Sequence, residues 1–428
     1  RMAKKDYLFL LLPSLICYFL LAYFIPRTDF LSTIGLYSLL FVVYLITSFK
    51  LNFSKKEIFI FGVLQRSIFI LSIPVLSDDI YRFYWDGLMS LNGYSPYEVL
   101  PENLILNKEI FTQLNSPKYF SIYPGFNQII FTIAALLGQH LIGFIIILHL
   151  LFIAGEALCF YLVDKIYPKN QLNLKLFFFN PLMILEFSGN LHFELFALIG
   201  LLGSIQYFNK SELKSAIFLG IAIATKLMPL IFLPIFFLKS SKKLIWIYIP
   251  VGVLTLTYLP FHHHTALLHI LSSIKLYFGD FEFNSSMYLL IGKDYKIYLK
   301  IVLLLAALSI YTLTWKKKLT IQKSIYALFV VYLFTSQSVH PWYILGFWGI
   351  IGIKNHKENL LWTFLIFWTY ITYRNTPYQQ QTWVNWTEYS LLIISVLIFH
   401  GKKIQSSLYL LLLQFQQFVK NKNKKLLD

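Results

Sequence analysis

Long apolar runs divide this chain, and they limit its possible folds more than any other feature of the sequence. Residues 7–25, 30–49 and 58–76 are each about long enough to cross the hydrocarbon core of a bilayer, which takes ~20 helical residues. Backbone polar groups in lipid must be satisfied within their own segment, so such runs fold as helices. We therefore expect an all-α, polytopic transmembrane helical bundle of about 12–15 spans. The further runs are at 124–139, 142–163, 172–187, 190–208, 213–238, 244–260, 297–315, 322–338, 341–353, 359–373 and 386–400.

Composition and charge agree with a membrane chain. Hydrophobic residues make up 57% of the sequence and charged residues 13%, whereas a soluble domain is roughly half apolar and a quarter charged. The formal net charge of +17 comes largely from short lysine clusters between apolar runs, which is typical of cytoplasmic loops under the positive-inside rule. The positive charge therefore indicates orientation and argues against a nucleic-acid partner.

The same lysine clusters predict the topology. Lys4 and Lys55, each beside another lysine, lie at inner ends of the first runs, so the third run delivers the chain to the outer side. Residues 77–123 then form the first large outer loop and residues 261–296 the second. Because no linker or soluble segment of foldable size separates the runs, we expect one integral-membrane domain over residues 1–428.

The start of the first outer loop, residues 77–87, is the first place where acids, a cation and aromatic residues gather. In a helix, Asp78 or Asp79 shares a face with Arg82, and Asp86 lies one turn further along. An amphipathic helix of this composition, directly after an apolar run, is expected to lie at the membrane interface. The alternative is an interfacial loop with a purely structural Asp–Arg pair.

Ionisable residues inside apolar runs form a second group of candidates, because charges in lipid are unfavourable and are often functional. Lys226 and Pro229 interrupt the run 213–238, where a broken helix pair and one long span are both compatible with the sequence. The structural alternatives are a hydrogen-bonded turn, a buried Lys–Glu pair and an aromatic cluster at the interface. The candidates are Glu156, Glu186 with Asn190, His192 and Glu194, then Lys226, and His340 beside Trp342 and Tyr343.

Metal and cofactor sites are not favoured by the sequence. Histidines at 262–264 and His269 suggest a metal site, but adjacent loop residues rarely converge on one ion and no acid or cysteine stands at ligand spacing. Cys17 and Cys159 lie in separate apolar runs, which supports neither a thiolate site nor a disulfide framework. The sequence also lacks a glycine-rich phosphate loop. We therefore expect neither a metal nor a cofactor.

Several segments, taken in chain order, resemble the integral-membrane GT-C glycosyltransferases. The similarity is greatest to bacterial polyprenyl-phosphate mannosyltransferases and more remote to the catalytic subunit of GPI mannosyltransferase I. It covers residues 70–345, although three runs precede the motif where many relatives have one, and Glu194 stands where relatives often carry Asp. The matching segments are Ser77-Asp78-Asp79-Ile80-Tyr81-Arg82 with Asp86-Gly87, Gly93-Tyr94-Ser95-Pro96-Tyr97, Ile122-Tyr123-Pro124, Asn180-Pro181 to Glu194, Thr225-Lys226 to Pro229, Phe283-Asn284-Ser285 and His340-Pro341-Trp342-Tyr343.

The resemblance implies a GT-C fold, a polyprenyl-phosphate sugar donor and an inverting displacement without a nucleotide. The first acid of the loop motif is the family's catalytic base, which by position is Asp78, with Asp79 as the alternative. Such a base takes the proton of the attacking hydroxyl. Arg82 and Lys226 are the candidate cations for the leaving phosphate. The other expected substrate-binding residues are Tyr81, Asp86, Tyr123, Glu186, Asn190, His192, Glu194, His340, Trp342 and Tyr343.

We therefore predict a glycosyltransferase that moves a sugar, expected to be mannose, from a polyprenyl phosphate to a hydroxyl of a lipid or glycan acceptor. The reaction is expected at the outer face of a bacterial cytoplasmic membrane, with no obligate protein partner. Arabinose and glucose are alternatives as the sugar. A lipid-linked sugar transporter or flippase is the alternative of another class, but it would place its ionisable residues near the bilayer midplane within repeated, broken helices. Clustering of the acids in one interfacial loop favours the enzyme.

Overall fold

The computed structural model describes residues 4–279, 281–346, 350 and 357–401. Within these ranges every regular element is helical, and extended pairing is limited to one bridge between Phe283 and Ser338. The predicted all-α bundle is thus confirmed. Lys354 and the lysine-rich tail, which contributed to the predicted topology, lie outside the described residues, as does part of the run 341–353.

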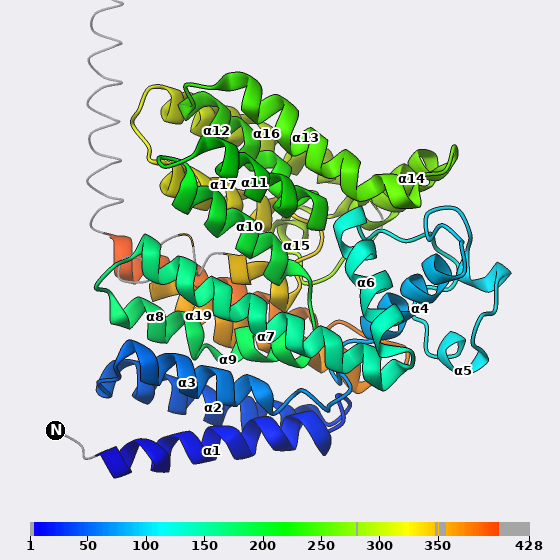
Figure 1. Ribbon diagram of the computed structural model, residues 1–428. Helices are drawn as coiled ribbons and strands as arrows, with labels where there is room; N and C mark the ends of the chain where they lie inside the picture. Colours follow the sequence, from blue (N-terminus) through cyan, green and yellow to red (C-terminus); the bar gives the residue numbers. More distant parts are fainter. Residues whose placement is uncertain (1–3, 280, 347–349, 351–356, 402–428) are drawn as a thin grey trace, which may run out of the picture.

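The N-terminal helices form one side of the bundle (Figure 1). Local capping sets two of their starts: Asp29 accepts a hydrogen bond from the Ser32 amide, and Ser54 forms a reciprocal capping box with Glu57. The third helix ends at Ser67, well before the predicted residue 76. Pro74 disfavours helical geometry at Ile73, so the helix does not resume directly before this proline. The three helices are α1 (Lys4–Tyr23), α2 (Phe30–Lys50) and α3 (Lys55–Ser67).

The predicted first outer loop folds at one end of the bundle, around the predicted amphipathic helix (Figure 1). Its main helix, α4 (Asp79–Leu91), packs against α6 (Gly125–Gly138), which in turn packs against α7 (Leu141–Ile166). Ile80, Phe83 and Trp85 are buried on α4. Between α4 and α6 lie the short helices η1 (Pro101–Asn103) and α5 (Lys108–Phe111).

Close approach of α4 and α6 depends on Gly87. A Cβ atom at this position would lie 2.6 Å from the carbonyl oxygen of Phe131 and 2.9 Å from the Cβ of Ala135. We expect Gly87→Ala to lower the free energy of unfolding by about 1–3 kcal/mol, as overpacking does in other close contacts. Thermal unfolding of the purified protein in detergent measures this. Gly35→Ala is the matched control, since nothing lies within 4 Å of a Cβ there; equal unfolding midpoints for the two variants would contradict the prediction.

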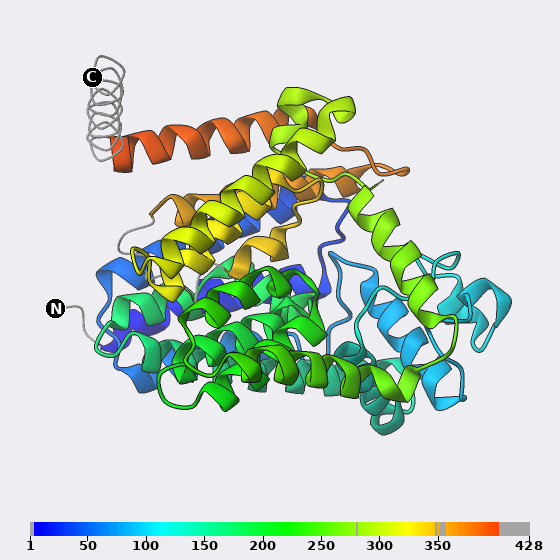
Figure 2. The same cartoon turned by 90° about the horizontal axis from the view of Figure 1, so that it is seen from above.

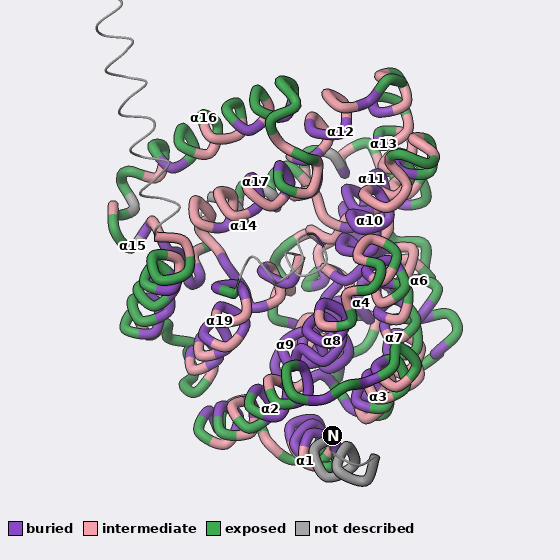
Figure 3. Tube along the Cα trace, turned by 90° about the vertical axis from the view of Figure 1, so that its left-hand side faces the viewer, coloured by how far each residue is buried: buried purple, intermediate pink, exposed green. Residues whose placement is uncertain are grey.

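The middle of the chain forms the most deeply buried part of the bundle, as the purple segments of Figure 3 show. Helix α10 packs against both α7 and α11, and α11 packs against α13. The run 213–238 is a broken helix, ending at Thr225 and resuming after Lys226, which resolves the two alternatives left by the sequence. The elements are α8 (Gln171–Phe178), α9 (Pro181–Met183), the π-helical turn η2 (Ile184–Gly189), α10 (Glu194–Tyr207), α11 (Glu212–Thr225), η3 (Met228–Phe232), α12 (Leu233–Lys239) and α13 (Lys243–Tyr258).

A buried ion pair ties α3 to α7. Arg66 Nε lies 2.6 Å from Glu156 Oε2, and Arg66 Nη1 donates to the carbonyl oxygens of Gly62 and Phe178 at 2.9 Å each. Ser188 donates to the other carboxylate oxygen of Glu156. Glu156, one of the functional candidates, therefore has a complete structural role, and removing either charge of such a buried pair is strongly destabilising.

The C-terminal half carries the predicted second outer loop and an extensive apolar surface. Seen from above, α14 extends toward the end of the bundle that contains α4 (Figure 2). Helices α13 and α16 expose many large apolar side chains, including Val251, Leu256, Leu304 and Leu305, as expected for surfaces that face lipid. The elements are η4 (Leu259–Phe261), α14 (Ala266–Gly279), α15 (Met287–Ile291), η5 (Lys293–Tyr295), α16 (Lys296–Trp315), α17 (Ile321–Thr335), η6 (Pro341–Gly346), α19 (Lys357–Leu365) and η8 (Ile366–Arg374).

Helix length divides the predicted runs into two groups. Among the described residues, five helices are long and apolar enough to cross a membrane, or six if one bent pair is a single span, which agrees with the predicted polytopic bundle. Several predicted runs form shorter or broken helices, because hydropathy does not reveal where a helix stops. The five are Phe30–Lys50, Leu141–Ile166, Lys243–Phe261, Lys296–Trp315 and Thr382–Gly401; shorter apolar helices are Leu11–Tyr23, Gly125–Gly138, Met228–Lys239 and Ile321–Thr335.

Candidate active site

Asp78 stands at the start of the outer-loop helix and is held by residues from distant parts of the chain. It is the residue immediately before α4. Arg27, in the connection between α1 and α2, donates from Nη2 to Asp78 Oδ2 at 2.7 Å. The hydroxyl of Tyr378 lies 3.5 Å from the same oxygen and also contacts Arg27. Asp78 is thus one half of an ion pair that fastens the loop helix to the N-terminal helices.

Asp79 has a different environment. Asn115 donates from Nδ2 to its Oδ1 at 3.1 Å. Burial raises the pKa of the Asp79 carboxyl above its ordinary value, and the Asn115 hydrogen bond acts in the opposite direction. The negative charge of Glu194 and the positive charge of Lys226 also act on this pKa, so both groups lie within electrostatic range of Asp79. Its raised pKa makes Asp79 a carboxylate suited to accept a proton.

Lys226 and Glu194 form an ion pair within electrostatic range of Asp79. Lys226 follows the last residue of α11, where the helix breaks, and its ammonium contacts the carboxylate of Glu194 at the start of α10. The same ammonium lies 3.8 Å from the ring centroid of Tyr343, a cation–π contact. The Lys226 side chain is 30% exposed, so a ligand can reach its charge.

The bent segment before α10 carries a buried hydrogen-bond chain. The helical axes of Pro181–Gly189 and Glu194–Tyr207 meet at 116°, and the π-helical turn concentrates polar side chains there. Tyr370 donates to Glu186 Oε1 at 2.7 Å, and Asn190 donates to Glu186 Oε2 at 3.3 Å. Asn190 also accepts from the amide of Leu76 at 3.2 Å. This chain links η8 to the residues just before Asp78.

A column of stacked aromatic rings connects the bent segment to the segment that begins at His340. The ring of Trp342 stacks on His192 with centroids 3.6 Å apart and on His340 with centroids 4.5 Å apart. His340 stacks in turn on Phe283, from the second outer loop, at 4.4 Å. The structure therefore brings together four candidates, His192, His340, Trp342 and Tyr343, that lie about 150 residues apart in two groups.

Three further predicted substrate-binding residues have other partners. Arg82 Nε donates to Asp86 Oδ1 at 2.7 Å, and Arg82 Nη1 donates to the carbonyl oxygens of Ser116 and Tyr119 at 2.8 and 2.9 Å. Ser121 and Gln128 donate to the second oxygen of Asp86. Tyr123 packs edge-on against Phe83 in the core. These contacts hold the outer loop in shape.

Tyr81 lies nearer to the acids. It is half-buried on α4, and burial raises the pKa of its hydroxyl. The charges of Asp78 and Arg27 also act on this pKa, in opposite directions, so Tyr81 borders the Arg27–Asp78 pair.

The contacts of Arg82 lead to a prediction that separates a structural role from phosphate binding. We expect Arg82→Gln to lower the free energy of unfolding by about 3–5 kcal/mol, because it leaves the buried Asp86 carboxylate without its cation. The protein that remains folded should bind the donor as the wild type does. Thermal unfolding and the KM for the donor measure the two effects, and Asp86→Asn should reproduce them. A raised KM for the donor together with unchanged stability would indicate that Arg82 binds the phosphate.

Some residues of the site carried no signal in the sequence. Arg27, Tyr370 and Tyr378 reach Asp78 or Glu186 across 51 to 300 positions, and Asn115 reaches Asp79 across 36. Arg27 alone could have been suspected, since it is an arginine at the outer end of the first run.

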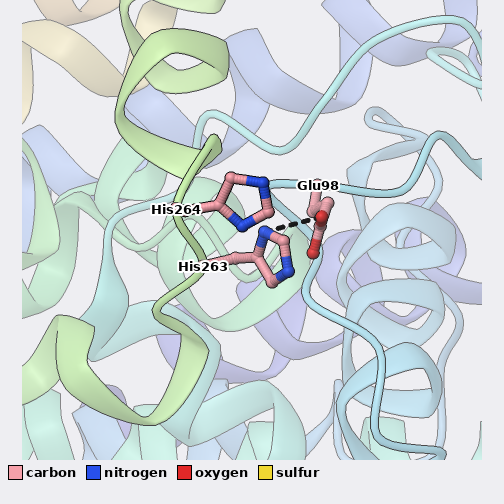
Figure 4. A group of neighbouring side chains, drawn as sticks. All are labelled: Glu98, His263 and His264. Atoms are coloured by element: carbon pink, nitrogen blue, oxygen red, sulfur yellow. Dashed lines mark ion pairs between the residues drawn. The ribbon is translucent and has the colours of Figure 1, made fainter.

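One group of side chains could hold a metal ion. Glu98, His263 and His264 place one ligand atom each within 4.8 Å of one another (Figure 4). No acid stands at ligand spacing from these histidines in the sequence, but the fold brings Glu98 to them from a distant segment of the chain.

Comparison with known proteins gives one family match. Residues 34–241 match the model of a family described as alpha-(1->6)-mannopyranosyltransferase, N-terminal domain. The matched range includes Asp78, Asp79, the bent segment and Lys226. No curated protein and no solved structure matches the chain. The chain is thus a membrane glycosyltransferase, and its residues 34–241 are similar to the N-terminal domain of the alpha-(1->6)-mannopyranosyltransferase family, a group of GT-C enzymes.

Proposed function

We propose that this enzyme transfers mannose from a polyprenyl-phosphate donor to a hydroxyl of a lipid or glycan acceptor at the outer face of the membrane. The observation that carries the proposal is the position of Asp79, at the start of α4 and within electrostatic range of the Lys226–Glu194 pair. A base beside a cation is what this reaction needs: one group takes a proton while the other meets the departing phosphate.

In the proposed reaction, the acceptor oxygen attacks the anomeric carbon on the face opposite the phosphate. The new bond joins this oxygen to the anomeric carbon, and the bond between that carbon and the phosphate oxygen breaks with its electron pair. The proton of the acceptor hydroxyl passes to Asp79, and polyprenyl phosphate leaves. One displacement inverts the anomeric configuration. We assign the base to Asp79, the second acid of the motif, because burial raises its pKa while Asp78 is occupied by Arg27.

The leaving phosphate requires positive charge at the same end of the site. Lys226 is suited to this role because its ammonium is partly exposed and lies at a helix break. Arg27 is the second candidate, since its side chain is 20% exposed and its guanidinium has donors beyond the one that binds Asp78. Fixed cations of this kind stabilise the developing phosphate charge. We accordingly expect transfer to require no added Mg²⁺ or Mn²⁺.

The stacked rings of His192, Trp342 and His340 are proposed to border the sugar. Aromatic faces suit the apolar C–H faces of a sugar ring, and the imidazoles offer hydrogen bonds to its hydroxyls. His340 Nδ1 is buried and has no hydrogen-bond partner among the described residues. The remaining polar candidates are Glu186 and Asn190. They are proposed to position the stacked rings, Glu186 through its hydrogen bond with Tyr370 and Asn190 through its hydrogen bond with the Leu76 amide.

The whole chain is proposed to work as one membrane domain with residues 77–123 and 261–296 outside. Cysteine-labelling of intact cells at Ser95→Cys, in an otherwise cysteine-free chain, tests the orientation. Labelling by a membrane-impermeant reagent is the expected result. Protection of this position until the membrane is opened would place the acids in the cytoplasm and overturn the outer-face mechanism.

The function itself is tested with the purified enzyme, polyprenyl-phosphate mannose labelled in the sugar, and a membrane lipid and glycan extract. The expected result is a labelled product that carries a new mannosyl bond. Its linkage should be examined first for α-1,6, because of the family match. GDP-mannose in place of the lipid donor should give none. Movement of the labelled lipid across vesicle membranes without any new glycosidic bond would instead support a flippase.

A further inference from the structure

We infer that Glu98, His263 and His264 form a zinc-binding site that joins the two outer loops. His263 Nδ1 lies 2.6 Å from Glu98 Oε1, and the rings of His263 and His264 are 4.1 Å apart (Figure 4). Both imidazoles and the carboxylate turn toward a common point between the loop segments that carry them. This inference concerns residues that the proposed transfer reaction does not use.

The two loop segments are held together on both sides of the three residues. Ser95 donates to the carbonyl oxygen of Phe261 at 2.8 Å, and a ring nitrogen of His269 lies 2.9 Å from the carbonyl oxygen of Tyr97. Tyr97 and Phe261 form a small buried cluster of their own with Ala266. Glu98 and the two histidines are therefore brought face to face by neighbours that are already fixed, which lowers the entropy lost when an ion binds.

Two imidazoles and one carboxylate are a ligand set that suits Zn²⁺, with water in the fourth position. Around a tetrahedral zinc ion, ligand atoms about 2.0–2.1 Å from the metal lie ~3.3 Å apart. The ligand atoms here lie within 4.8 Å of one another, so modest side-chain rotations close the site. All three side chains are partly or fully exposed, which leaves a path for the ion.

An ion pair between Glu98 and a protonated His263 is the simplest alternative, but it leaves the position of His264 without a reason. Protonating both histidines would bring two positive rings together with one carboxylate to neutralise them. A shared divalent ion uses both rings in their neutral form and gives each a ligand role. The ion would act as a clip that closes the chain between residues 98 and 263, and so would lower the frequency with which the outer loops separate.

Metal binding to the full-length enzyme tests the inference without any measurement of transfer. The protein is purified in detergent with a histidine-free tag, stripped with a chelator, equilibrated with Zn²⁺ and separated from free metal by gel filtration. We expect one zinc per chain and a thermal unfolding midpoint raised by the metal. His263→Ala, His264→Ala and Glu98→Gln should each weaken zinc binding by about tenfold or more and abolish the rise in the midpoint.

His262→Ala is the matched control, because this histidine is adjacent in sequence but lies outside the group. It should leave the zinc content and the shift in midpoint unchanged. Equal zinc content in the wild type and His263→Ala, or loss of zinc in His262→Ala, would overturn the site. Absence of zinc from the wild type would do the same. Because the readout is stoichiometry, failure here is distinguishable from failure of the proposed transfer reaction.

Discussion

Asp79→Asn is expected to abolish mannose transfer, with a fall in kcat of about 10²–10⁴-fold, the range that a positioned general base contributes. The amide fills the same space and still faces Asn115, but it does not accept the proton of the attacking hydroxyl. Initial rates with labelled polyprenyl-phosphate mannose measure the fall, and an unchanged thermal unfolding midpoint shows that the variant is folded.

The matched control for this base is Asp78→Asn at the neighbouring position. Because Asp78 binds Arg27, this change should raise the KM for the donor and lower stability while retaining a larger share of kcat. Loss of kcat in Asp78→Asn together with a rate within a few-fold of wild type in Asp79→Asn would move the base to Asp78. Substantial kcat in both variants would show that neither Asp78 nor Asp79 is the general base.

The pH dependence of transfer follows from the raised pKa of Asp79. The ionised carboxylate is the active form, so the rate should fall at low pH as Asp79 takes up a proton, and this fall should begin at a higher pH than for an ordinary aspartate. Asn115→Ala removes a hydrogen bond that lowers the pKa, and should therefore move the acidic limb to still higher pH. An acidic limb at the same pH in the wild type and in Asn115→Ala would show that a group other than Asp79 controls the fall in rate.

Lys226→Met is expected to slow transfer by about ten- to more than a hundredfold, because a charge-assisted contact with the leaving phosphate is worth about 1.5–3 kcal/mol. Lys226→Arg keeps the charge and should restore part of the rate. Steady-state kinetics with the lipid donor measure both variants, and a loss that appears mainly in kcat indicates contact with the phosphate in the transition state.

A control is needed because Lys226 also neutralises Glu194. Removing the lysine alone leaves the Glu194 carboxylate without its partner and can reduce stability. The double change Lys226→Met with Glu194→Gln removes both charges, so it should recover stability but not the rate. Recovery of the rate in the double variant would show that Lys226 serves only the ion pair.

Local sequence patterns predicted much of the outer-loop helix and of its surroundings. The spacing of Asp79, Arg82 and Asp86 predicted a helix that starts near residue 78, and α4 begins at Asp79. The sequence also allowed a structural Asp–Arg pair, and Arg82 and Asp86 form one. We therefore propose Lys226 and Arg27, and not Arg82, as the cations that meet the phosphate. The break at Lys226 and the turn around Asn190 were visible as interruptions of apolar runs.

The sequence alone determined the helical class, the membrane setting and the position of the helix that begins at Asp79, because hydrophobic run length and helical spacing act over neighbouring residues. Tertiary structure alone decided which side chains from distant segments meet. Arg27 with Asp78, Tyr370 with Glu186 and Glu98 with His263 are contacts between segments that lie 51, 184 and 165 positions apart. Such contacts depend on how whole helices pack against one another, and one chain's residue order does not encode that packing as a local pattern.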